Sequence, residues 1–321
     1  MTSFGPADGA DGADGADGAD GADGADGAYG EGASGRRSSL IRPIGVSPAL
    51  KKLSTENWFR GNKWPPAELA AYSNTVASKF PENAWSDYHF SIVVLGDFVK
   101  QTGWDTIDLQ GNAPIPTGSQ LKDELDELLE LVDYRAGVMS EALAQRNNIC
   151  AYWAGLLMFN KRSHPATYRL AQIALRVGQF QAMHYKYNPS LPGVTPVLPP
   201  RPRPSQLSPS LLPPIEVPGH ASYPSGHATE SYLLASMLAE VMPPQASTKS
   251  NSTDDDSTPL RRLAQRVARN REVLGLHYPS DSKAGRYLGD QSWQILRGCA
   301  SVQTLLSVAK NQEWKTNEGI P

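Results

Sequence analysis

The chain has 321 residues, of which 40% are hydrophobic and 20% are charged, and its formal net charge is −3. This length allows one large domain or two modest ones, and the composition supplies enough apolar side chains for a core. A charge balance this close to zero, without a dense cluster of Lys and Arg, argues against a nucleic-acid-binding surface.

The N-terminal region has an unusual repeat. Residues 7–27 repeat Ala-Asp-Gly seven times. This composition cannot bury apolar surface, so we expect residues 1–48 to be a disordered tail and linker. The first 35 residues contain eight acids and neither Lys nor Arg, and without them the net charge of the chain changes from −3 to +5. A mildly basic body suits a small anionic substrate.

The folded body is predicted to be a single domain covering residues 49–315. Pro65-Pro66 is typical of a helix start, which predicts a helix over Ala67–Phe80. A second helix is predicted within Trp85–Lys100. Residues 103–118 contain Gly, Pro and Asn at the positions that mark a loop.

Residues 119–145 form the most strongly periodic segment. Apolar residues recur at helical spacing on one face, and acids occupy the other. The acids between Asp123 and Glu130 have two interpretations, a metal-binding group or a solvated helix face. We predict the solvated face, because such acidic runs usually face water.

Two further helices are predicted before the chain changes character. Ile149–Phe159 is apolar nearly all round, which is typical of a central buried helix. This run is too short to span a bilayer, which takes roughly 18 residues or more. His164–Lys186 is predicted to be a long amphipathic helix.

The second half of the chain alternates between loops and helices. Tyr187–Pro218 is rich in prolines, which interrupt helices, so we expect an extended loop. Helices are predicted over Gly226–Met242, Leu260–Leu276 and Ser280–Ala309, with a polar loop over Pro243–Pro259. Because no convincing set of strands accompanies these helices, the predicted fold class is an all-α helical bundle.

The cysteines and the N-terminus indicate in which cellular compartment we expect the protein. Cys150 and Cys299 show neither a disulfide framework nor a metal-ligand spacing, so both are predicted to be buried thiols. The N-terminus lacks the basic and apolar regions of a signal peptide. We therefore expect a soluble cytoplasmic protein.

An anion site is predicted at the start of the helix over residues 226–242. Ser225 stands at the N-cap position, and Gly226 lets an anion approach the backbone. The first N–H groups of a helix have no partners within the helix, and with the helix dipole they attract anions. His227 would lie at this position as a proton donor. The alternative is a capped helix with an incidental histidine.

A second predicted group consists of Arg271, His277 and Asp281. Pro279 suits the first position of a new helix, so we expect His277 just before that helix and Asp281 in its first turn. The carboxylate would then accept a hydrogen bond from one imidazole nitrogen and leave the other free as a nucleophile. Arg271 offers a fork of donors suited to a phosphate-like anion, although a surface ion pair is the alternative.

Other basic residues accompany these two groups. Arg203 adds a guanidinium in the Pro-rich loop, where the alternative is an exposed loop charge. Arg201 and His220 are further candidates for the same pocket. No metal-ligand spacing accompanies them, so no metal site is predicted.

These segments resemble the type 2 phosphatidic acid phosphatase and vanadium haloperoxidase superfamily. Pro224-Ser225-Gly226-His227 matches one of its motifs in full. Arg271, His277 and Asp281 match another, with five and then three intervening residues. Arg203-Pro204 matches the end of the first motif. The matched motifs cover residues 184–285.

Two positions depart from the family pattern. Asn270 stands where the family has Ser. The lysine of the first motif is Lys186 if the Pro-rich loop holds an insertion of ten residues. Otherwise the lysine is absent, or Arg201 takes part of its role.

The resemblance implies a helical bundle and specific residue roles. In the phosphatases of this superfamily, the residue matching His277 attacks phosphorus and forms a phosphohistidine, and the residue matching His227 protonates the leaving oxygen. The phosphoryl oxygens are held by the residues matching Lys186, Arg203, Ser225, Gly226 and Arg271. In the haloperoxidase branch the same pocket holds vanadate, bonded to the residue matching His277, as the cofactor for halide oxidation by peroxide.

Three hypotheses follow from the resemblance. The preferred one is a soluble phosphoester hydrolase that acts on a small phosphorylated substrate and needs no cofactor. The alternative is a vanadate-dependent haloperoxidase that uses halide and peroxide. The third is a non-enzymatic member that uses its tail and Pro-rich loop for interactions. The sequence leaves the oligomeric state open.

Overall fold

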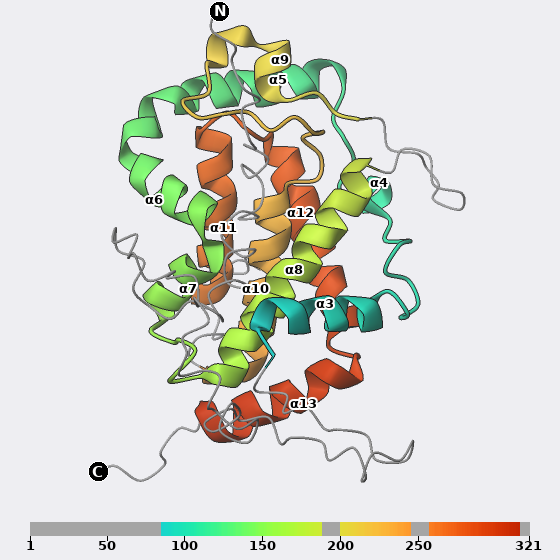
Figure 1. The fold of residues 1–321 in the computed structure, drawn as a ribbon. Helices are drawn as coiled ribbons and strands as arrows, with labels where there is room; N and C mark the ends of the chain where they lie inside the picture. The colour runs from blue at the N-terminus through green and yellow to red at the C-terminus, as the bar shows by residue number, and fades with distance from the viewer. Residues whose placement is uncertain (1–84, 188–199, 245–256, 315–321) are drawn as a thin grey trace, which may run out of the picture. The chain divides into compact units, whose positions relative to one another are not determined.

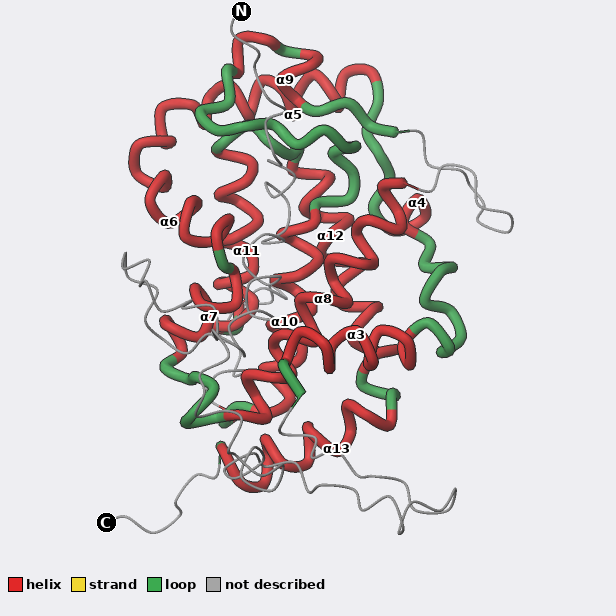
Figure 2. The backbone as a smooth tube through the Cα atoms, viewed as in Figure 1, coloured by secondary structure: helices red, strands yellow, loops and turns green. Residues whose placement is uncertain are grey.

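A computed structural model describes residues 85–187, 200–244 and 257–314. These residues form helices and loops, and no strand occurs among them (Figures 1 and 2). The predicted all-α fold is thus confirmed. The predicted tail and linker over residues 1–48 and the predicted helix over Ala67–Phe80 lie outside the described residues, as do residues 188–199 and 245–256 of the two later loops.

Helix α10 (Gly226–Val241) forms the centre of the bundle. It packs against α8 (Pro165–Tyr187), α11 (Pro259–Val273) and α12 (Pro279–Leu296), which surround it in Figure 1. The leucines of α10 are fully buried in the main core, and each such leucine contributes about 2 kcal/mol through burial.

Glycines allow α12 to pack closely on α10. A Cβ atom at Gly285 would lie 2.6 Å from the carbonyl oxygen of Ser225, and one at Gly289 would lie 2.6 Å from that of Thr229. The two glycines are four residues apart and therefore share one face of α12. Only glycine permits this separation, which brings the first turns of the two helices together.

The periodic segment over residues 119–145 is not one helix. It consists of α5 (Gly118–Glu130), a 3-10 turn (Leu131–Tyr134) and α6 (Arg135–Asn147). Its apolar residues pack in two separate clusters. The leucines of α5 pack with Leu211 and Tyr278, whereas α6 packs against Leu274 and Leu276. The chain bends between the helices so that each can reach its own cluster.

The prediction of a central helix over Ile149–Phe159 was wrong in position. Helix α7 (Ile149–Leu157) lies at the edge of the bundle (Figure 1), and Leu156 is 52% exposed. The central helix α10 instead contains Ser, Thr and Glu. Small side chains on and around α10 allow the neighbouring helices to pack closely against it. The apolar content of a segment, on which the prediction was based, does not show where such small side chains lie.

The remaining predictions agree with the structure in outline. Helix α3 (Asp87–Phe98) lies within the predicted range, and the predicted loop before α5 contains only the short α4 (Leu109–Asn112). The Pro-rich segment contains the short α9 (Pro204–Leu207) and a 3-10 turn (Pro209–Leu211), so helix does form there briefly. The predicted last helix is divided at residues 297–299 into α12 and α13 (Ala300–Val308).

Two further predictions concern membrane-spanning helices and the cysteines. In the part of the chain that the structure describes, every helix is too short or too polar to cross a bilayer. Cys150 and Cys299 are both buried and free, as predicted.

Candidate functional site

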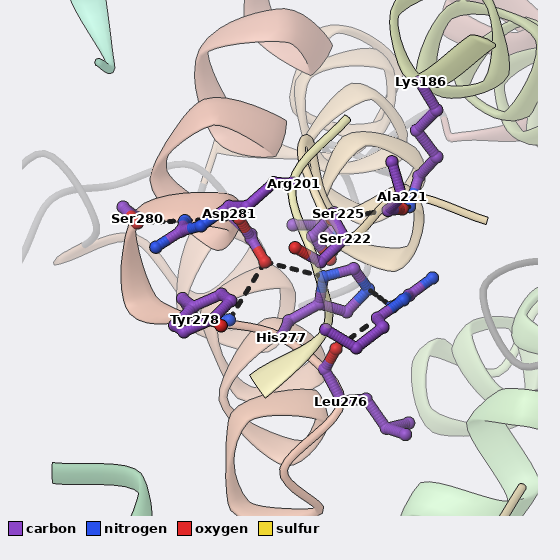
Figure 3. A network of polar contacts seen from close by, with 12 residues as sticks. Lys186, Arg201, Ala221, Ser222, Ser225, Leu276, His277, Tyr278, Ser280 and Asp281 are labelled. Carbon is purple, nitrogen blue, oxygen red and sulfur yellow. Dashed lines mark hydrogen bonds and ion pairs between the residues drawn. The ribbon is translucent and has the colours of Figure 1, made fainter. Parts of the chain in front are cut away.

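The three segments identified in the sequence meet where the Pro-rich segment passes the first turns of α10 and α12 (Figure 3). The backbone N–H of Ser225, which caps α10, donates to the carbonyl of Asp281 in α12 at 3.0 Å. Arg203 of the Pro-rich segment reaches His277 between α11 and α12. Residues that are distant in the sequence thus form one buried polar network.

The end of α11 directs His277 into this network. Gly275 follows the last turn with φ +74°, a conformation that favours glycine. The chain therefore changes direction at Gly275, and Leu276 and His277 lie in the short connection before α12. Asp281 stands in the first turn of α12, and its side chain accepts from the backbone N–H of Tyr278 at 3.0 Å. The predicted positions of His277 and Asp281 relative to α12 are confirmed.

His277 and Asp281 form a buried pair. Nδ1 of His277 lies 3.2 Å from Oδ2 of Asp281, and neither side chain is exposed. Burial is the largest effect on the pKa of Asp281 and raises it. The hydrogen bond from His277, the charge of Arg201 and the Tyr278 N–H lower it by more, so the pKa lies below its ordinary value. Asp281 is therefore an anion that only accepts hydrogen bonds.

The neighbours of His277 determine its tautomer. Nη1 of Arg203 lies 3.1 Å from Nε2 of His277. A guanidinium only donates hydrogen bonds, so Nε2 accepts with its lone pair, and the proton is on Nδ1 facing Asp281. The nitrogen with the lone pair is thus presented to a cation.

Arg203 is itself held rigidly. Its Nε donates to the carbonyl of His220 at 3.0 Å, and Nη1 also donates to the carbonyl of Leu276 at 3.0 Å. Nη2 lies 3.1 Å from Nδ1 of His220, which accepts because arginine has no acceptor. The alternative of an exposed loop charge is wrong for Arg203, which is 2% exposed.

Arg201 binds the other side of Asp281. Its Nη1 donates to Oδ1 of Asp281 and to Oγ of Ser280, each at 2.6 Å. Its guanidinium also lies over the ring of Tyr278, 3.7 Å from the centroid, in a cation–π contact. Arg201 therefore holds the carboxylate of Asp281, which orients His277. None of these contacts joins Arg201 to His277 directly.

Glu124 of α5 is the last member of this network. It was not identified from the sequence as a site residue. It accepts from Nη2 of Arg201 at 2.8 Å and from the backbone N–H of Ser280 at 2.7 Å. The sequence placed it on a solvated face, but its side chain is only 13% exposed. Its neighbours Asp126 and Glu127 are on the exposed side, as predicted. A carboxylate at the first turn of α12 also matches the helix dipole.

Lys186 lies at the end of α8 and is buried. Its Nζ donates to the carbonyl of Ala221 at 2.8 Å and more weakly to that of Ser222 at 3.4 Å (Figure 3). Lys186 thus binds the segment over residues 220–225. In this segment the carbonyl of His220 accepts from Arg203, and Ser225 caps α10. The structure thus places Lys186 beside the start of the Pro-Ser-Gly-His motif.

The start of α10 has the predicted form. Ser225 caps the helix, and its hydroxyl accepts from the N–H of Ala228 at 3.4 Å. Gly226 and His227 occupy the first turn, where backbone N–H groups lack partners within the helix. Ser225, Gly226 and His227 are buried.

Arg271 is directed toward α6. Its Nη2 donates to the carbonyl of Ala142 at 2.7 Å and to Oε1 of Gln145 at 3.3 Å. Asn270 binds the same oxygen of Gln145 at 3.1 Å. These contacts bury Arg271 completely, so the alternative of a surface ion pair with Asp281 is wrong.

A pocket of about 600 Å³ opens beside the network. Arg201, Arg203 and His220 line it together with prolines of the Pro-rich segment and Val217. This lining combines donors for an anion with apolar surface for an attached group. Among the described residues, no three His, Cys, Asp or Glu side chains are grouped so that they could hold a metal ion.

Part of the chain is similar to known phosphatases. It is 30% identical over 93 residues to a non-specific acid phosphatase of Salmonella typhimurium, which is 29% of this chain and 33% of that protein. It is 31% identical over 91 residues to a non-specific acid phosphatase of Salmonella typhi, 28% and 32% of the two chains. The chain thus spans about a third of the length of the curated relatives that it matches. No family model matches the chain.

Proposed function

We propose that this chain is a phosphoester hydrolase of the type 2 phosphatidic acid phosphatase superfamily, with His277 as its nucleophile and no metal requirement. The observation that carries the proposal is the position of His277. Its Nδ1 is held by the Asp281 carboxylate, and its Nε2 faces the Arg203 guanidinium. This arrangement suits a nucleophile whose target is an anion.

The proposed reaction has two steps. Nε2 of His277 attacks the phosphorus of a phosphate monoester, and the bond to the leaving oxygen breaks while His227 gives that oxygen a proton. Water then attacks the phosphohistidine, His227 takes up the proton of the water, and inorganic phosphate leaves with Nε2 restored. Asp281 stabilises the positive charge on the imidazole in between.

The phosphoryl oxygens would be held by Arg203, Lys186 and Arg271 with the first turn of α10. Lys186 and Arg271 donate to backbone carbonyls, and in the proposed complex these donors turn to the phosphoryl oxygens. Positive charge supplied in this way replaces a metal ion. The prolines and Val217 of the neighbouring pocket would contact the leaving group.

The partial similarity to acid phosphatases supports hydrolysis over halide oxidation. In the haloperoxidase alternative, the same residues would hold vanadate, with Nε2 of His277 as its ligand. The catalytic domain in either case is proposed to be residues 49–315.

The test compares two activities on the purified full chain. We expect hydrolysis of p-nitrophenyl phosphate without added metal, inhibition by vanadate, and an acid-labile phosphohistidine on His277. His277→Ala should lower the rate by at least about a thousandfold. The matched control is His89→Ala, because His89 lies on α3, which contributes no residue to the network described above.

Two outcomes would contradict the proposal. Unchanged hydrolysis by a folded His277→Ala protein would remove His277 as the nucleophile. Bromide oxidation with vanadate and peroxide, in the absence of phosphatase turnover, would replace the hydrolase with the haloperoxidase alternative.

A further inference from the structure

A second pocket lies between α11 and α12, with Tyr232 of α10 in its lining. Its volume is about 500 Å³, and none of its lining residues lines the pocket beside Arg203. Its charged residues are Arg262, Arg266, Arg269, Glu272, Lys283 and Arg286. Five of these six are basic, although the chain as a whole is slightly acidic.

The basic residues lie in two facing rows. Arg262, Arg266 and Arg269 follow one another along α11 at intervals of four and three residues, so they share one face of the helix. Lys283 and Arg286 are three residues apart on α12 and form the second row. A ligand between the helices would therefore meet cations from both sides.

Carboxylates neutralise only part of this charge. Arg266 pairs with Glu141 at 2.7 Å, and Arg269 pairs with Glu127 and Glu272, each at 2.6 Å. Within the described residues, no carboxylate lies within ion-pair distance of Arg262 or Lys283. The pocket therefore keeps a positive excess that faces solvent.

The inner wall of the pocket is polar and buried. Asn270, Glu272 and Ser282 contribute to it, and each is less than a tenth exposed. Burial raises the pKa of Glu272, and contacts with Ser282 and Arg269 oppose that rise only in part. Donors such as Asn270 and Ser282 can bind oxyanions in addition to the charged rows.

This pocket is close in sequence to the residues around His277 but opens on another side of the same helices. Glu272 follows Arg271, and Ser282 follows Asp281. Successive residues of a helix point about 100° apart. The last turn of α11 thus presents Arg271 to α6 and Glu272 to the pocket, and the first turn of α12 presents Asp281 to His277 and Ser282 to the pocket.

We propose that the pocket between α11 and α12 is a second anion site, which binds a small, multiply charged phosphate compound such as a diphosphate or bisphosphate. The argument for several charges is the number of cations, because five basic side chains from two helices line the pocket. A volume of about 500 Å³ accommodates such a molecule. This site is independent of the proposed hydrolase reaction, because it shares no lining residue with the pocket beside His277.

The test is a calorimetric titration of the full chain with methylenediphosphonate, which cannot be hydrolysed. The double variant Arg262→Gln/Lys283→Gln removes two cations for which no described carboxylate is within ion-pair distance. We expect its affinity to fall by at least about tenfold, because each charged hydrogen bond that is lost weakens binding. Binding to the unmodified chain should also weaken as salt is added.

The matched control is Lys122→Gln/Lys310→Gln, which makes the same change in net charge at two exposed lysines outside the pocket. It should bind as the unmodified chain does. A thermal melt with and without the ligand gives a second readout, since a ligand that binds the folded state raises the melting temperature.

Two results would overturn the proposal. One is the absence of binding to the unmodified chain. The other is equal affinity and stoichiometry in the two double variants, which would place the ligand elsewhere. Neither result depends on phosphatase turnover, so failure of the proposed function and failure of this site can be told apart.

Discussion

Glu124 connects the network around His277 to a helix far away in the sequence. Through Arg201 it acts on Asp281, and through the Ser280 N–H it acts on the first turn of α12. Loss of the negative charge of Glu124 leaves Arg201 with one carboxylate partner, Asp281, in place of two. We therefore regard Glu124 as a residue that positions Asp281.

We predict that Glu124→Gln lowers the stability of the protein by about 2 kcal/mol, since it removes a charged hydrogen bond in a partly buried setting. The turnover number should fall about tenfold, with a smaller change in KM, because substrate contacts are left in place. Urea unfolding and steady-state kinetics with p-nitrophenyl phosphate measure the two effects.

Glu127→Gln on the same helix is the control. Glu127 pairs with Arg269 where both side chains are more than 40% exposed, so its loss should cost less than about 1 kcal/mol. Equal effects of the two substitutions would remove the special role of Glu124.

Asp281 gives a prediction for pH. Its pKa is lowered in the folded protein, so its contribution to stability is complete above the ordinary aspartate pKa of about 3.9 and is lost as the pH falls through the lower folded pKa. The difference in unfolding free energy between the unmodified chain and Asp281→Asn should therefore be constant near neutrality and shrink in strong acid. Urea unfolding at a series of pH values measures it. A difference that stays constant into strong acid would contradict the lowered pKa.

For single residues, the sequence predicted the position well where the residue lies only a few positions from a helix start. Ser225, His277 and Asp281 lie beside helix starts that Pro and Gly marked, so their local geometry followed from the chain. Glu124 could not be predicted, because its partner Arg201 is 77 residues away and an acidic run gives no sign of which member turns inward. The direction of Arg271 was also unpredictable, since it depends on carbonyls of α6.

At the scale of helices, the close contact of α10 and α12 brings the segments of the candidate site together. Gly285 lies against the carbonyl of Ser225, and a Cβ there would also meet Cβ of Ala228 at 2.7 Å. Backbone atoms at such distances cannot move aside without shifting a helix.

We predict that Gly285→Ala destabilises the protein by about 1–3 kcal/mol through this overlap. On the proposed function it also lowers turnover, because it shifts the start of α10, which carries His227, relative to the start of α12, which follows His277. Thermal or urea unfolding and kinetics measure the two effects. Gly137→Ala on α6 is the control, because nothing lies within 4 Å of its added Cβ. Alanine is the better helix former, so this substitution should stabilise the protein by up to about 1 kcal/mol. Stabilisation by both substitutions would show that the two helices are not packed as described.

Helix periodicity predicted most helices but not their interruptions. The bend at residues 131–134 arises because α5 and α6 pack against different clusters, and a one-dimensional pattern of apolar residues does not distinguish clusters. The central position of α10 was missed for a related reason. It depends on small residues that permit close approach, such as Gly285 and Gly289 on its neighbour.

For the whole molecule, the Ala-Asp-Gly repeat gives a simple prediction. Its composition offers nothing to bury, so removal of residues 1–48 should leave the melting temperature and the turnover of p-nitrophenyl phosphate unchanged. Calorimetry and kinetics on the shortened chain measure both. A fall of about 3 °C, which corresponds to roughly 1 kcal/mol in a domain of this size, would show that this region supports the fold.

The contacts of Arg201 have a consequence for the order in which the protein assembles. They join the Pro-rich segment to α5 across 77 residues and to α12 across 80 residues. Helices form from local contacts, whereas contacts of this range require long loops to close first. The polar network is therefore complete only when all three segments have docked, and turnover is expected to be the last property to recover during refolding, after the helical signal has returned.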